Sequence, residues 1–309
     1  MPDWPDIAYA DWRETAAALQ LWTQIVGKVR LALTPWVNHG WQVPLYVSAR
    51  GLMTSPIPSG AGILEIEFDF IAHRLAARTS RGGQAGFPLE PRAVADFYHR
   101  VMELLHGLGV QVAVNEMPNE VADPIRFSQD VTHRSYDAPA AHRFWQALVQ
   151  VDRVFRLFRT GFLGKVSPVH FFWGSFDLAV TRFSGRRAPR HPGGIPGLPD
   201  SVTREAYSHE VSSAGFWPGS EAYPHPAFYS YAYPEPPGFR ARPVPGGALF
   251  DAALGEFVLP YDTVRAAADP DALLLDFLSS SYAAAADCGG WDRAALECPF
   301  GVPGQVRQV

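Results

Sequence analysis

The residues best suited to chemistry lie in one stretch, residues 167–191, where polar side chains interrupt two apolar segments. His170 and Asp177 stand on either side of Gly174-Ser175, a dipeptide typical of tight turns. If this turn joins antiparallel strands, both side chains share one face of the hairpin, within diagonal reach of each other. A carboxylate beside an imidazole raises its basicity and fixes its tautomer, which suits a general base or a metal ligand. The alternative is a core histidine with satisfied hydrogen bonds beside an aspartate that caps the turn.

His209 and Glu210 are two further candidate catalytic residues. Neighbouring residues on a strand point to opposite faces, so both can serve one site on this strand only if a bulge intervenes. His209 would complete a set of two histidines and one carboxylate with His170 and Asp177, the ligand combination of many open metal sites. The spacing is diagnostic of no particular metal. A bound divalent cation is therefore an open alternative to chemistry without a metal.

Arginine and aromatic side chains near these residues are candidates for substrate binding. Four arginines, Arg182, Arg186, Arg187 and Arg190, precede a Gly-rich segment. Guanidinium groups with backbone amides suit an anion; a solvated basic loop is the alternative. Tryptophan and tyrosine combine apolar bulk with one hydrogen-bond donor and line many pockets, although they also fill cores. The candidate substrate-binding residues are Arg182, Arg186, Trp173, Tyr229, His39 and Trp41.

Length and composition indicate a globular protein. The 309 residues are 47% hydrophobic and 13% aromatic, enough for a self-sufficient core. A net charge of −5 argues against a general nucleic-acid or anionic-membrane binder. Cys288 and Cys298 are too few for a disulfide framework. No segment reaches the ~18 apolar residues of a membrane helix, and the N-terminus lacks the pattern of a secretory signal.

We therefore expect a cytoplasmic protein with a small-molecule ligand and with neither nucleic acid nor membrane as partner. The sequence leaves its oligomeric state open.

Hydrophobic periodicity predicts the elements that must position these side chains. Apolar residues at three- and four-residue steps predict amphipathic helices over residues 11–33, 91–109 and 137–163. Residues 262–265 and then 270–286 are expected to form the last helix, which is rich in small residues and can pack closely. Alternating segments predict strand pairs over residues 41–57, 63–79, 167–191, 207–233 and 248–259, and a single short strand over residues 110–114.

These elements predict an α+β fold, mostly antiparallel sheet with long flanking helices. We expect one compact domain, residues 1–309, built from two related halves of about 11–114 and 138–286, because each reads as a helix, antiparallel strands and a helix. The second half carries a Pro-, Gly- and aromatic-rich loop region, residues 186–247, which we expect to be ordered because it holds many large rings.

Five segments resemble those of an uncharacterised bacterial family, a domain of unknown function. They are Asn38-His39-Gly40-Trp41, Thr54–Pro58, Ser167–Asp177, Tyr207-Ser208-His209-Glu210 and Tyr233-Pro234-Glu235-Pro236. The resemblance spans nearly the whole chain. Since the family has no known activity, it implies no mechanism, cofactor or catalytic residue.

The residues support three hypotheses about function. The first is an enzyme acting on a small anionic or polar-aromatic molecule, by histidine–carboxylate acid–base chemistry or with a metal. His170, oriented by Asp177, would be the base, and Arg182 or Arg186 would hold the anion. The second is a non-catalytic small-molecule-binding or protein-interaction module. The third is a structural role, which predicts a large exposed apolar patch. Convergence of titratable groups would favour the enzyme.

Overall fold

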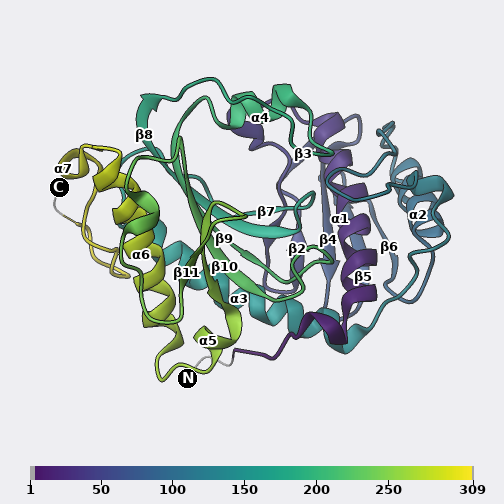
Figure 1. Cartoon of the computed structure of the whole chain (residues 1–309). Helices are drawn as coiled ribbons and strands as arrows, with labels where there is room; N and C mark the ends of the chain where they lie inside the picture. The colour runs from purple at the N-terminus through teal and green to yellow at the C-terminus, as the bar shows by residue number, and fades with distance from the viewer. Residues whose placement is uncertain (1–3, 308–309) are drawn as a thin grey trace.

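Two six-stranded antiparallel sheets, each preceded and followed by helices, make up the chain (Figure 1). The structure is a computed structural model that describes residues 4–307. In Figure 1 the first sheet lies to the right and the second to the left. The predicted α+β class is confirmed. Within residues 4–307, no helix is long and apolar enough to cross a membrane.

The first half places six strands between two helices. Their bounds are α1 (Arg13–Leu33), β1 (Tyr46–Val47), β2 (Gly51–Met53), β3 (Ile57–Ser59), β4 (Gly62–Asp69), β5 (Arg74–Thr79), β6 (Gln84–Pro88) and α2 (Val94–Gly107). Strands β1, β2, β4, β5 and β6 are neighbours in this order, and β3 also pairs with β4. Helix α1 ends at Leu33 because Thr34 precedes Pro35, and a residue before proline disfavours the helical conformation.

Residues 110–114, predicted as a strand, form none. Val110 is buried, and Val112 and Val114 pack against the core without pairing in a sheet. The alternation of valines reflects this packing.

The second half repeats the order of helix, six strands and helix. Its elements are α3 (Ala138–Thr160), β7 (His170–Phe172), β8 (Asp177–Arg187), α4 (Asp200–Ala206), β9 (His209–Trp217), β10 (Ala227–Tyr233), β11 (Leu249–Asp251), β12 (Glu256–Pro260), α5 (Tyr261–Arg265), α6 (Pro270–Cys288) and α7 (Arg293–Leu296). The sheet order is β11-β12-β10-β9-β8-β7. Short 3₁₀ turns are η1 (Tyr9–Asp11), η2 (Asn38–Gly40), η3 (Phe127–Gln129) and η4 (Phe239–Ala241). Helix α3 begins at a cap, since the Asp137 side chain accepts a hydrogen bond from the Ala140 amide.

The two halves meet at the strand edges of their sheets. Leu45 and Phe171 exchange two backbone hydrogen bonds of 2.9 Å each. Helix contacts are reciprocal as well: Gln20 of α1 donates to a carbonyl in the β7–β8 turn, and Trp145 of α3 donates to a carbonyl in the β1–β2 turn. Related halves would be expected to pack in this reciprocal way, and the duplication itself stays a prediction.

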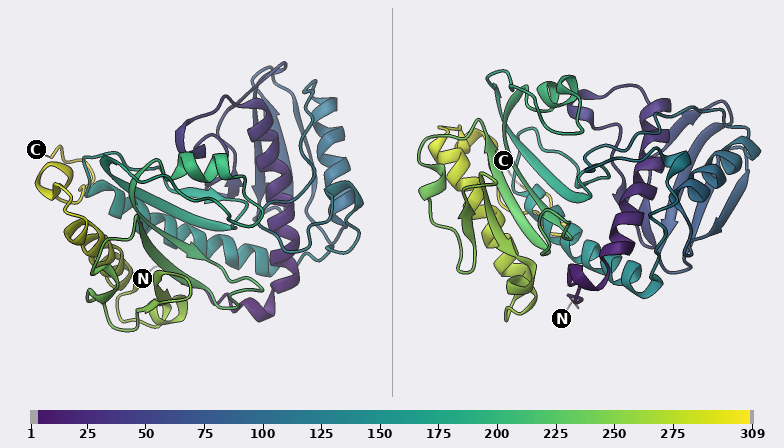
Figure 2. Two further views of the ribbon diagram at one scale, coloured as in Figure 1. Left: turned by 45° about the horizontal axis from the view of Figure 1, so that its top comes forward. Right: turned by 45° about the vertical axis from the view of Figure 1, so that its right-hand side comes forward.

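The second sheet has two chemically different faces. Helices α3 and α6 pack against this sheet, and Figure 2 shows α6 alongside its curved strands. Phe228 of β10 contacts Phe155 of α3, so the even-numbered residues of β8, β9 and β10 face the helices. The odd-numbered residues face the other way. We call this the tyrosine face, and its polar residues include Asp177, Thr181, Ser213, Tyr229 and Tyr231.

Candidate functional site

The hairpin of β7 and β8 has the predicted register. Phe172 lies opposite Asp177, so His170 and Asp177 share the tyrosine face. Their side chains have different partners, however. The Asp177 carboxylate accepts hydrogen bonds from the hydroxyl groups of Ser175 and Tyr229, while neither ring nitrogen of His170 has a hydrogen-bond partner among the described residues. The predicted contact between His170 and Asp177 is therefore wrong.

Gly215 explains why Asp177 turns away from His170. Gly215 lies on β9, directly between Ala179 of β8 and Tyr229 of β10. A Cβ atom added at Gly215 would lie 2.2 Å from the Tyr229 hydroxyl oxygen. The Tyr229 side chain therefore crosses β9 over bare backbone and brings its hydroxyl group to Asp177. Glycine inside a strand commonly marks such a close approach.

His170 is an enclosed, uncharged imidazole. It is 1% exposed, and the rings of Trp41, Tyr46 and Phe172 surround it at centroid distances of 5.3 to 5.7 Å. Burial, together with the charge of two nearby arginines, lowers the pKa of His170 to about 3. An efficient general base has a pKa closer to the working pH. This environment argues against the predicted role of His170 as the base.

Asp177 belongs instead to a group that we call the acid–tyrosine cluster. Its members come from β8, β10, β12, the C-terminal end of α4 and the segment between α2 and α3. They are Asp177, Tyr229, Tyr231, Glu256, Tyr207 and Glu120. The hydroxyl groups of Tyr207 and Tyr231 are 2.8 Å apart. Burial raises the pKa of Tyr207, and the three carboxylates add to the rise, so Tyr207 lies within electrostatic reach of all of them.

The carboxyl groups of this cluster hold their protons unusually tightly. Burial raises the pKa of Asp177 to about 6, against the opposing effect of its two hydroxyl donors. Burial and then the charge of Asp177 raise the pKa of Glu120 to about 7 and that of Glu256 to about 8. The Glu120 residue is exposed, so water screens its charge. We therefore give Asp177, which is 3% exposed, and Glu256 the greater weight.

Within the described part of the chain, no basic side chain forms an ion pair with these carboxyl groups. Among the ion pairs of residues 4–307, none includes Asp177, Glu120 or Glu256. The Oε2 atom of Glu256 is buried and has no hydrogen-bond partner within residues 4–307. A buried carboxylate without a partner is unfavourable, so the cluster favours either bound protons or a positive charge.

Aromatic rings extend along the same face. Trp217 stacks on Tyr229 with ring centroids 4.4 Å apart and an interplanar angle of 27°. Tyr229 and Tyr231 are nearly parallel, at 14° and 6.1 Å. Tyr207 stacks on His191 at 4.9 Å. The faces of such rings attract cations, which adds to the preference of the carboxyl groups for positive charge.

Three other predicted residues lie together at a second place, which we call the histidine–lysine cluster. The His39 ring is 5.4 Å from the Trp41 ring and 6.1 Å from the His209 ring. Lys165 completes the cluster, since its Nζ donates a 2.6 Å hydrogen bond to His39 Nε2. The three aromatic members were predicted from the sequence, whereas the lysine was not.

Three predicted site residues have structural partners instead. Arg182 points to the helix side of the sheet, where it stacks on the Phe158 ring at 3.5 Å and donates to the Phe158 carbonyl. Arg186 forms a 2.7 Å ion pair with Glu210 and donates to two carbonyl groups beyond α6. Trp173 is buried and donates to a backbone carbonyl in the segment before β1. Both arginines are engaged with groups of the protein, and their role in holding an anion beside His170 stays a prediction.

The predicted metal set is not assembled. Residues 4–307 contain no group of three His, Cys, Asp or Glu side chains placed to hold a metal ion. His209 contacts His39, whereas Asp177 is bound to hydroxyl groups and His170 is enclosed by rings. Because the three candidate ligands turn to different neighbours, they cannot share one ion.

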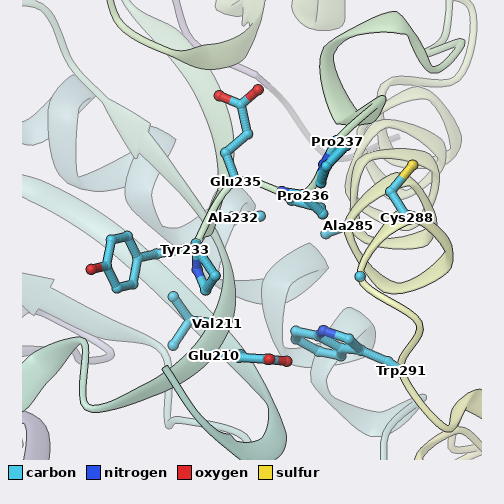
Figure 3. Close-up of a pocket in the computed structure, with 12 residues that line it drawn as sticks. Glu210, Val211, Ala232, Tyr233, Glu235, Pro236, Pro237, Ala285, Cys288 and Trp291 are labelled. Atoms are coloured by element: carbon cyan, nitrogen blue, oxygen red, sulfur yellow. The ribbon is translucent and has the colours of Figure 1, made fainter. Parts of the chain in front are cut away.

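A pocket of about 250 Å³ lies elsewhere, between β9, β10 and the end of α6 (Figure 3). Among its lining residues are Glu210, Tyr233, Glu235, Pro236, Cys288 and Trp291. Glu210 is paired with Arg186, and Glu235 with Arg240. Glu210 therefore lies away from His209, as expected for neighbours on a strand, and its carboxylate is already neutralised.

Glu120, Glu256 and Lys165 were not predicted from the sequence. One signal was available: the small residues Ser212 to Gly215 leave one strand bare, and Tyr229 and Tyr231 alternate onto one face of the next strand. Glu120 comes from an irregular segment, and no periodicity connects it to the sheet.

Comparison with known proteins gives a family but no activity. No curated protein and no solved structure shows significant similarity to the chain. A family model described as a family of unknown function matches residues 4–298, nearly the whole chain. The chain therefore belongs to this family, DUF5996, in agreement with the resemblance of its sequence segments.

Proposed function

We propose that the protein binds a small, positively charged organic molecule at the acid–tyrosine cluster and exchanges a proton with it through Asp177 and Glu256. The observation that carries this proposal is the buried Asp177–Tyr229 hydrogen bond, set among carboxyl groups that have no basic partner within residues 4–307.

Electrostatics favours a cation over the anion expected from the sequence. A bound cation would lower the raised pKa values of Asp177 and Glu256, because an opposite charge stabilises a carboxylate. An anion would meet two or three carboxyl groups and gain no guanidinium partner, since Arg182 and Arg186 are engaged elsewhere.

The shape of the ligand follows from the rings. Trp217, Tyr229 and Tyr231 present stacked aromatic side chains beside the carboxyl groups. Such a combination suits an ammonium group attached to a flat or short apolar body. Amines of this kind would place the charge near Asp177 and the apolar part against the rings.

An acid–base enzyme is the leading class for this site. A group whose pKa lies near neutrality can both give and accept a proton at cellular pH. Asp177 and Glu256 meet this condition, with pKa values of about 6 and about 8. They replace His170 in the role that the sequence had suggested. A binding protein without turnover would use the same contacts.

Isothermal titration calorimetry with three ligands of similar size tests the proposal. Benzylamine is a cation, benzyl alcohol is neutral and benzoate is an anion. We expect benzylamine alone to bind, and we expect its binding heat at pH 7 to depend on the ionisation enthalpy of the buffer, because the carboxyl groups release protons. Equal binding of all three ligands, or binding of benzoate alone, would contradict the proposal.

A pair of matched variants locates the site. Glu256→Gln removes one charge of the cluster and should weaken benzylamine binding by about tenfold, the effect of ~1.4 kcal/mol. Glu235→Gln removes the carboxylate that pairs with Arg240 outside the cluster and should leave binding unchanged. If both variants bind like the unchanged protein, the cation is held elsewhere.

A further inference from the structure

Lys165 has an environment that the proposed function does not use. Its Nζ lies 2.6 Å from His39 Nε2 and above two aromatic rings, 5.0 Å from the centroid of Trp41 and 4.8 Å from that of Phe183. The residue is nevertheless exposed, so a small molecule can reach the amine. An accessible amine beside an imidazole is the arrangement expected of a nucleophile with its base.

Backbone contacts fix the tautomer of the imidazole. His39 Nδ1 lies 3.0 Å from the Ala206 carbonyl oxygen, which can only accept a hydrogen bond. Nδ1 therefore carries the hydrogen, and Nε2 presents its lone pair to Lys165. The imidazole is held as a proton acceptor facing the ammonium group.

His39 also has a strained backbone. Its φ of 63° and ψ of 16° lie in the left-handed region that favours glycine. Strained residues of this kind occur preferentially at functional sites, where the surrounding structure enforces them. The η2 turn thus places the imidazole against Lys165 despite a conformational penalty.

The other lysine is a contrast within the same chain. Lys28 and Lys165 are the only two lysines among 26 Lys and Arg residues. Lys28 is 3% exposed and donates to the Met117 carbonyl. It has no imidazole partner among its described hydrogen bonds. Only Lys165 combines exposure with a proton acceptor.

We propose that Lys165 forms an imine with a small aldehyde or ketone, with His39 as its proton acceptor. The Lys165 ammonium group passes a proton to His39 Nε2, and the free amine attacks the carbonyl carbon, forming a C–N bond while the C=O π electrons move to oxygen. His39 returns the proton to that oxygen and gives a carbinolamine. The carbinolamine nitrogen, which still carries the positive charge, passes one proton to the hydroxyl group; its freed lone pair then expels water, and a protonated imine results.

The electrostatic surroundings support this step. Burial lowers the pKa of Lys165, although the carboxylate of Glu205 partly offsets this. Burial also lowers the pKa of His39, and the charges of Lys165 and His209 lower it further. The imidazole therefore keeps the proton only transiently. Glu205 of α4 and His209 of β9 are the titratable groups that face this pair.

The reacting groups of the histidine–lysine cluster lie far from Asp177, although Ala206, which binds His39, adjoins Tyr207 of the acid–tyrosine cluster. Phe183, under Lys165, is six residues from Asp177 along β8, or roughly 20 Å at ~3.4 Å per residue. The imine chemistry therefore does not depend on cation binding at Asp177, and either proposal can fail without the other.

Reductive trapping of the full-length protein tests the inference. The protein is incubated at pH 7 with propionaldehyde and cyanoborohydride, with Nα-acetyl-lysine in the same tube as a reference amine, and modified peptides are quantified by mass spectrometry. We expect Lys165 to be alkylated at least about tenfold faster than the reference, because a positioned base commonly contributes more than this. Lys28 should stay unmodified while the protein is folded.

Two histidine variants test whether His39 acts as the base for Lys165. His39→Gln should bring the rate at Lys165 down to that of the reference, and His106→Gln, on α2 and outside both clusters, should leave it unchanged. Alkylation of Lys165 no faster than Nα-acetyl-lysine in the unchanged protein overturns the inference. That comparison needs no variant, so it holds even if His39→Gln fails to fold.

Discussion

Tyr229 reaches Asp177 across Gly215, because only a residue without a side chain leaves room for the phenol ring over β9. The hydrogen bond joins β10 to β8 over the intervening strand. This one relationship both draws Asp177 away from His170 and places its carboxyl group among the tyrosines.

Gly215→Ala should therefore disrupt the acid–tyrosine cluster. The added Cβ atom would overlap the Tyr229 ring, and overpacking of this kind costs about 1–3 kcal/mol. Urea denaturation should show this loss, together with weaker benzylamine binding. Gly107→Ala is the control, since an added Cβ atom there meets nothing within 4 Å. Equal stability of the two variants would show that Tyr229 does not depend on Gly215.

Asp177→Asn should change how stability depends on pH. The folded-state pKa of Asp177 is raised from 3.8 to about 6, so its contribution to stability is complete below about pH 4 and is lost as the pH rises through 6. The variant lacks this loss. Its free energy of unfolding should fall less than that of the unchanged protein between pH 4 and 7. Parallel curves would mean that Asp177 ionises normally.

His170→Leu should have the opposite pH signature. The folded-state pKa of His170 is lowered from 6.5 to about 3, so its contribution is present above pH 6.5 and is lost as the pH falls toward 3. Leucine removes this acid sensitivity and a buried imidazole without a hydrogen-bond partner. Relative to the unchanged protein, the variant should gain stability between pH 7 and 5 in chemical denaturation. A constant difference would mean that His170 has the same pKa in the folded protein as in the unfolded chain.

Gly27→Ala tests how the two halves pack. A Cβ atom at Gly27 of α1 would lie 2.1 Å from Trp173 Nε1 in the β7–β8 turn. Trp173 is buried and bonded to the Val43 carbonyl, so it has little freedom to move. We expect a loss of about 1–3 kcal/mol by thermal or urea denaturation. A loss below about 0.5 kcal/mol would show that the turn adapts easily.

The fold was largely predictable because its signals are local. The helical period of residues 13–33 and 138–160 and the hairpin register Phe172↔Asp177 depend on neighbours in the sequence. The short strand β6 and helix α4 were missed, since their few residues carry too little periodicity.

The candidate site was predicted only in part, because its contacts span the sheet. The sequence placed His170 and Asp177 on one face, which is correct, but the contact between them competes with Tyr229, which is 52 residues away from Asp177 in sequence. Whether Asp177 turns to β7 or β10 depends on the bare backbone of Gly215. No local sequence pattern predicts which of the two strands supplies the partner of Asp177.

Carboxyl titration by NMR tests the central claim most directly. With selectively ¹³C-labelled carboxyl groups assigned by Asp177→Asn and Glu256→Gln, the two groups should titrate near pH 6 and pH 8 in the free protein. Saturating benzylamine should lower both midpoints, because the bound cation favours the carboxylates. Midpoints near 4 in the free protein, or midpoints that benzylamine leaves unchanged, would contradict a cation site at the acid–tyrosine cluster.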